Sequence, residues 1–208
     1  MSTLSATSRK PSKKLRRWEL ALLLGVAIAA LIGVRLDGQQ AALADRVVRL
    51  HVIPNSDAPE DQALKLEVRD RILAQAETFL SAGKTPDEAA ALLSAHLPEL
   101  ANAGAEAVRE AGYRYPVSVS LEDQVWFPTK QYDDFALPAG QYRALRVVIG
   151  EGAGQNWWCV VFPPLCLGSV TESTAQTAAE GGLDQDQIAL ITGENEGYVI
   201  KFKVLELL

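Results

Sequence analysis

The side chains best suited to chemistry gather where a predicted strand, 47–53, runs into a predicted helix. His51 stands near the end of the strand, and Asp57 and Asp61 flank the start of the helix. An imidazole and two carboxylates that converge on one cleft could act as general acid and base in a hydrolase. Each also has a structural role open to it: Asp57 as a helix N-cap, Asp61 as a first-turn acid and His51 as a hydrogen-bonded strand residue. Because no Gly-x-Ser-x-Gly or His-Glu-x-x-His signature is present, the sequence favours the structural roles.

The charged face of the same helix is a second candidate site. Asp61 and Lys65 are spaced as an i,i+4 ion pair, and so are Glu67 and Arg71. Such a face is either solvated helix surface or a recognition surface, and the spacing leaves both open. The residues that we predict for partner binding here are His51, Asn55, Ser56, Asp57, Asp61, Gln62, Lys65, Arg69 and Asp70.

Two aromatic residues and two cysteines mark a later segment. Trp157 and Trp158 are neighbours in a predicted strand, so they point to opposite faces, and an exposed tryptophan is a frequent binding anchor. We add both to the candidate partner-binding residues. Cys159 and Cys166 are the only cysteines, and we predict a disulfide between them rather than a metal site or a redox pair.

The N-terminal residues have the pattern of an export signal. Residues 1–17 contain six basic side chains and no acid, and residues 20–34 are uninterrupted and apolar. A helix of that apolar length spans only about 22 Å, which favours a cleaved signal peptide over a membrane anchor at 20–36. We predict that 1–44 is a signal peptide or signal anchor and that 45–208 is a single exported domain.

Charge narrows the class of partner. Residues 45–208 carry 13 basic and 24 acidic side chains. Nucleic acid and anionic lipid both bind through protein cations, so neither is expected as a partner. We expect a protein or neutral surface as partner and no cofactor. Membrane contact is expected only through the N-terminal segment, if that segment is not cleaved.

The hydrophobic period predicts an α+β fold. It is a mostly antiparallel sheet of about five strands, with two or three helices inserted between the first and second strands and packed on one face. The long helical connection permits the first two strands to be parallel neighbours. A glycine-rich loop at 150–154 suits a hairpin, and the polar stretch 168–196 suggests a mobile insertion. The predicted strands are 47–53, 117–121, 142–149, 157–162 and 198–204, and the predicted helices begin near Ala58, Pro86 and Pro98.

Several of these segments together resemble the stage II sporulation protein R family. Pro54 departs from the pattern, where a small residue is expected, and the stretch 168–196 carries no match. The matching segments are Leu50–Asp57, Asp61–Lys65, Val68–Asp70, Gly112-Tyr113, Gly140–Tyr142, Leu145–Gly150, and Asn156–Cys159 through to Cys166.

The resemblance implies a signal that the forespore makes and exports into the space between the forespore and mother-cell membranes. There it would trigger a membrane aspartic protease, which cleaves the pro-form of sigma-E. The chain itself would then not be catalytic. Two other classes stay open on the residues alone: a secreted hydrolase of cell wall or protein that uses His51 and Asp57, and a membrane-anchored structural adaptor of the envelope.

Overall fold

A computed structural model describes residues 16–80, 85–132, 134–165 and 174–192. The chain divides into two units, 1–38 and 39–208. Helix α1 (Arg17–Ala44) makes up the described part of the first unit and continues into the second. Of the helices that the described residues form, none has the length and apolar content needed to cross a membrane. The export signal at 1–44 stays a prediction.

A mixed four-stranded sheet forms the centre of the second unit, and its strand order is β2-β5-β1-β6. The central strand β1 runs parallel to β5 and antiparallel to β6, while β2 is antiparallel to β5. The α+β prediction is confirmed, but the sheet is mixed. The strands are β1 (Val48–Ile53), β2 (Val117–Phe127), β5 (Gly140–Ile149) and β6 (Trp157–Phe162), with a separate small ladder of β3 (Lys130–Gln131) and β4 (Ala136–Leu137).

Two predicted pairings are wrong for one reason. The loop 150–154 does not close a hairpin, because β1 lies between β5 and β6. For the same reason the parallel neighbour of β1 is β5 and not β2. Strand β1 has a central position, and five of its six residues are buried.

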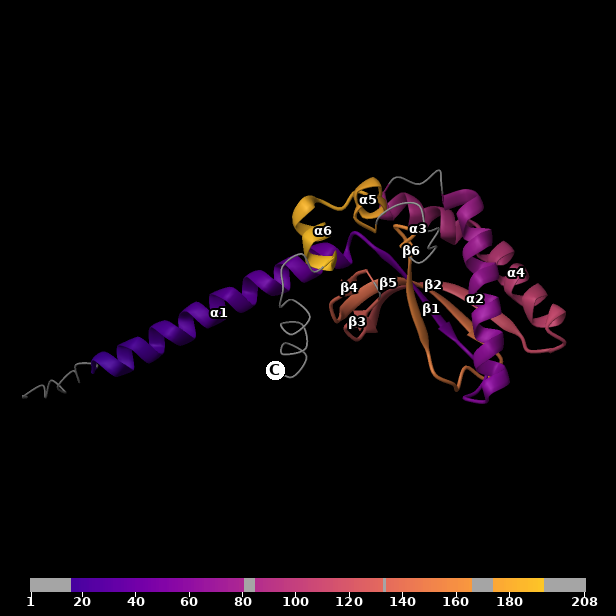
Figure 1. The fold of residues 1–208 in the computed structure, drawn as a ribbon, viewed down its shortest axis with the longest axis horizontal. Coiled ribbons are helices and arrows are strands. Elements are labelled where there is room, and N and C mark those ends of the chain that lie inside the picture. Colours follow the sequence, from indigo (N-terminus) through magenta and orange to yellow (C-terminus); the bar gives the residue numbers. More distant parts are fainter. Residues whose placement is uncertain (1–15, 81–84, 133, 166–173, 193–208) are drawn as a thin grey trace, which may run out of the picture. The chain divides into compact units, whose positions relative to one another are not determined.

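Three helices connect β1 to β2, within the predicted number: α2 (Pro59–Leu80), α3 (Pro86–Ala95) and α4 (Leu97–Glu110). Helices α2 and α4 lie side by side over one face of the sheet (Figure 1). The helix predicted to begin near Pro86 is confirmed as α3, and a capping box forms its start, since Thr85 and Glu88 cap each other's backbone amides. The core under the helices joins Leu50 and Val52 of β1 to the apolar stripe of α2.

The second face of the sheet carries a separate apolar cluster. Helices α5 (Thr174–Glu180) and α6 (Gln185–Thr192) contribute buried side chains to it. The prediction of a mobile insertion is wrong for the part of 168–196 that these helices occupy, where Ala178, Leu190 and Ile191 are buried. The apolar residues of this stretch are too few to show a helical period in the sequence. The predicted strand at 198–204 lies outside the described residues.

Candidate functional site

Three loops meet at the edge of the sheet where the parallel strands β1 and β5 end. They are the β1–α2 loop (54–58), the α4–β2 loop (111–116) and the β5–β6 loop (150–156). Backbone hydrogen bonds join them, from Gly150 N–H to the Pro116 carbonyl at 2.9 Å and from Gly154 N–H to the Pro54 carbonyl at 3.2 Å. Most of the predicted site residues lie on this edge.

Asp61 is the buried centre of the edge. It comes from the first turn of α2 and is only 2% exposed. The Ser56 hydroxyl donates to its Oδ2 at 2.6 Å, and the Asn55 amide donates to the same oxygen at 2.9 Å. These two hydrogen bonds, of which the one from Ser56 has the larger effect, hold the pKa of the Asp61 carboxyl below its usual value. The carboxylate therefore holds the β1–α2 loop against the helix.

The β5–β6 loop is held by the same short segment. Asn55 Oδ1 accepts from the Glu151 N–H at 3.0 Å, and Asp57 Oδ1 accepts from the Gln155 N–H at 2.6 Å. The prediction that Asp57 caps α2 is therefore wrong, because its carboxylate accepts from the backbone of the β5–β6 loop instead. Gly150 has a φ of +61°, and a Cβ there would meet the Asn55 amide at 2.3 Å.

Lys65 belongs to this internal network and not to an exposed face. It is 5% exposed and donates to Gln62 Oε1 at 2.5 Å and to the Gln155 carbonyl oxygen at 2.8 Å. Burial lowers the pKa of its ammonium group. The predicted i,i+4 pairs are absent among the described residues, because Lys65 turns to the β5–β6 loop and Arg71 bonds Glu110 of α4.

The two tryptophans lie on opposite faces of edge strand β6, as predicted, and both are half-buried. Trp157 faces the helices, with the Arg69 guanidinium stacked 4.6 Å from its ring centroid. Arg69 also bonds Asp70 at 2.7 Å. The most exposed aromatic residue on the sheet is instead Trp126 of β2, at 64% exposure, which the sequence analysis did not single out.

His51 is turned away from the carboxylates. It lies on the second face of the sheet, with its ring centroid 5.8 Å from that of Phe127 and 6.3 Å from that of Trp158. Burial lowers the pKa of its imidazole, while the Asn156 side chain favours the protonated form. The structure therefore does not bring His51 to Asp57 or Asp61, as a hydrolase built on these residues would need. Among the described residues, no three potential metal ligands cluster.

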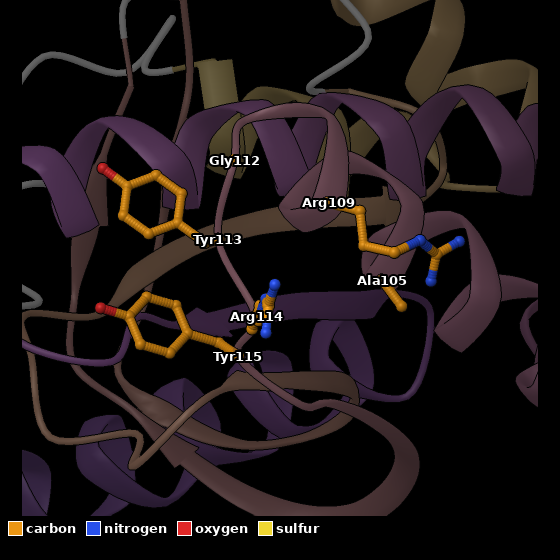
Figure 2. Close-up of a pocket in the computed structure, with 6 residues that line it drawn as sticks. All are labelled: Ala105, Arg109, Gly112, Tyr113, Arg114 and Tyr115. Carbon is orange, nitrogen blue, oxygen red and sulfur yellow. The ribbon is translucent and has the colours of Figure 1, made fainter.

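An open pocket of about 500 Å³ lies beside this edge, at the end of α4. Figure 2 shows the Tyr113 and Tyr115 rings one above the other, with their hydroxyl groups on the same side. The ring centroids are 5.5 Å apart. Two exposed cations, Arg109 of α4 and Arg114 of the α4–β2 loop, also line it, together with Ala105 and Gly112 (Figure 2).

Two features of the structure, this pocket and the buried Arg49, were not predicted from the sequence. The alternation Tyr-Arg-Tyr at 113–115 was the available signal for the pocket, since it precedes a strand and places both rings on one side. The signal for the second feature was Arg49, a charged residue inside the apolar run of β1. Arg49 is 0% exposed.

The predicted disulfide joins Cys159, which is buried in β6, to Cys166, which lies outside the described residues. We expect alkylation of the exported protein without reductant to modify neither cysteine. Closing so short a loop contributes roughly 2–2.5 kcal/mol in the chain-entropy treatment, so Cys159→Ser with Cys166→Ser should lower the thermal midpoint by several degrees. Recovery of two alkylated cysteines by mass spectrometry would contradict the pairing.

Comparison with known proteins points to one family. The model of the family described as stage II sporulation protein R matches residues 44–172. A stage II sporulation protein R of Bacillus subtilis (strain 168) is 36% identical over 131 residues, which are 63% of this chain. The match covers 58% of that relative's length. No solved structure matches the chain.

Proposed function

Because the chain belongs to the stage II sporulation protein R family, we propose that it is an exported sporulation signal that activates another enzyme by binding to it. The enzyme is a membrane aspartic protease that cleaves pro-sigma-E in the mother cell. The signal acts in the space between the forespore and mother-cell membranes, and it is itself not catalytic. Its N-terminal segment directs export and, if it is not cleaved, makes the membrane contact.

The pocket beside the loop edge is the observation that supports a binding function. The whole chain has a net charge of −6, yet this pocket exposes two arginines next to two stacked tyrosines. Arginine and tyrosine are enriched among the residues that dominate binding energy at protein interfaces. We assign the pocket to an acidic segment of the protease, which the arginine side chains would pair with and the tyrosine rings would cover.

The loop network gives this pocket a rigid base. The Gly150 amide bonds to the carbonyl of Pro116, the residue that follows Tyr115. The Asp61 carboxylate in turn interacts favourably with the Tyr115 hydroxyl. The internal residues Asn55, Ser56 and Asp61 then act on the partner indirectly, by fixing the pocket wall. A binding surface that is fixed before association loses less conformational entropy on binding.

Charge reversal at the pocket tests the proposal. We expect Arg114→Glu to reduce protease activation at least about ten-fold, because loss of an interface arginine can cost 2 kcal/mol or more. The side chain is exposed, so the free energy of unfolding should change by less than about 0.5 kcal/mol. The measurement is cleavage of pro-sigma-E by the reconstituted protease as the full chain is titrated in.

Lys130→Glu is the matched control. Lys130 is exposed on β3 and the substitution changes the charge by the same amount. It should leave activation unchanged. Full activation by a folded Arg114→Glu protein would remove the pocket from the interface. Release of cell-wall fragments or peptides by the purified chain without the protease would contradict the non-catalytic role.

A further inference from the structure

Arg49 is a buried cation that no carboxylate of the described residues neutralises. It is the second residue of β1, on the face opposite α2 and α4, at 0% exposure. Its Nε donates to the Cys159 carbonyl oxygen at 3.3 Å, and its Nη2 donates to the Tyr132 hydroxyl at 3.0 Å. Its Nη1 makes no hydrogen bond. Part of the donor capacity of the guanidinium is therefore unused.

Aromatic rings supply only part of what a buried guanidinium needs. The Arg49 Cζ lies 4.2 Å from the ring centroid of Phe127 and 5.0 Å from that of Tyr142. The ring faces attract the positive charge, but they do not replace an oxygen acceptor for the Nη1 hydrogens. A carboxylate fits such a fork, because its two oxygens accept from two guanidinium nitrogens in parallel.

His51 adds unused polar atoms on the same face of the same strand. It follows Arg49 by two residues, so both side chains leave β1 in the same direction. Both His51 ring nitrogens are buried, and within the described part of the chain neither has a partner at full hydrogen-bond geometry, although the Asn156 side chain lies close enough to act on the ring. A neutral imidazole carries one N–H donor, so this face offers hydrogen-bond donors from two neighbouring residues of β1.

Tyr132 already holds one oxygen against the guanidinium. Its hydroxyl accepts from Arg49 and donates to the Trp158 carbonyl oxygen at 2.9 Å. Burial raises the pKa of this phenol, which stays neutral at pH 7. Tyr132 is itself only half-buried, and its ring stacks on Phe135 at 4.4 Å between centroids. A neutral oxygen thus occupies a position on Arg49 where an anionic oxygen would bind more strongly.

We propose that Arg49 and His51 form a binding site for one carboxylate group. Its oxygens accept from Nη1 and Nη2 of Arg49, displacing the Tyr132 hydroxyl by rotation of that side chain, and from the His51 ring. The neighbouring rings of Phe127 and Trp158 favour a carboxylate attached to an apolar group. The source is either a free carboxylic acid or the C-terminal residue of a peptide. This site rests on the fold alone and does not depend on the protease proposed above.

The decisive variant is Tyr132→Phe, which removes the competing hydroxyl and keeps the ring. We expect acetate to bind this variant about ten-fold more tightly than it binds the wild type, because Nη2 then has no partner to give up. The readout is the thermal midpoint of the full chain as acetate replaces chloride at constant ionic strength. The ¹⁵N shifts of Arg49 Nη and of the His51 ring should move with acetate in the same titration.

Two further variants and a comparison of ligands test the same site. Arg49→Met should abolish the acetate dependence, and Arg71→Met, at an arginine of α2 that pairs with Glu110, should leave it as in the wild type. Tighter binding of N-acetylphenylalanine than of acetate would identify the C-terminal residue of a peptide as the source of the carboxylate. Tighter binding of acetate would identify a small carboxylic acid. N-acetylphenylalanine amide, which has no carboxylate, should not bind. If Tyr132→Phe only lowers the midpoint, and acetate changes neither the midpoint nor the ¹⁵N shifts, the proposal is overturned.

Discussion

Asp61→Ala should lower the thermal midpoint of the protein by about 10 °C. The substitution removes the acceptor of both the Ser56 hydroxyl and the Asn55 amide at a position that is 2% exposed. Each donor left without a partner costs about 1–3 kcal/mol, and 1 kcal/mol corresponds to about 2–4 °C in a domain of this size. Thermal unfolding followed by circular dichroism at pH 7 measures the effect.

The same carboxylate gives the effect a defined pH dependence. Its pKa is lowered in the folded state, so its contribution to stability is complete above the unfolded-state pKa of about 3.9 and is lost as the pH falls through the lower folded-state pKa. We therefore expect the midpoints of the wild type and Asp61→Asn to differ at pH 7 and to converge in acid.

Asp70→Ala is the control for this prediction. Asp70 is on the same helix, but its side chain is 64% exposed and, within the described ranges, its one ion pair is with Arg69. Its loss should change the free energy of unfolding by less than about 0.5 kcal/mol. An Asp61→Ala protein that is as stable as Asp70→Ala would show that the network around Asp61 does not hold the loop edge together.

Gly154→Ala should be nearly as disruptive, although it adds a single methyl group. A Cβ at this position would lie 2.1 Å from the Ser56 carbonyl oxygen and 2.8 Å from the Pro54 ring. Because the first of these atoms belongs to the backbone, the β5–β6 loop must move away from the β1–α2 loop. That movement breaks the bond from the Gly154 N–H to the Pro54 carbonyl and the bond from the Gln155 N–H to Asp57.

We expect this change to cost about 2–4 kcal/mol, in the range of overpacked sites, and to expose the Gln155 amide. Hydrogen exchange should show faster exchange at Gln155 than in the wild type. Gly140→Ala is the matched control, because a Cβ there meets only the Tyr142 ring at 3.5 Å, an ordinary contact. Unchanged protection of Gln155 in Gly154→Ala would mean that the two loops are not locked together.

The sequence by itself determined the local elements of this protein. The apolar stripe of α2, the capping box at Thr85 and the alternation in β2 each report on residues within one or two turns, so they predicted the elements and their order. The α+β class and the helices between β1 and β2 followed from that order. The family was also available from sequence, because its matching segments are continuous stretches of the chain.

The tertiary structure alone decided which residues meet. Strand order depends on contacts between distant segments, so the placement of β1 between β5 and β6 could not be derived from the glycines at 150–154. The i,i+4 rule describes an isolated helix, whereas Lys65 found acceptors in a loop 90 residues away. His51 is separated from the carboxylates of Asp57 and Asp61 because its side chain packs against Phe127 and Trp158 on the second face of the sheet. There it lies on the face of Arg49, whose unfilled hydrogen-bonding capacity becomes visible only when its surroundings are known.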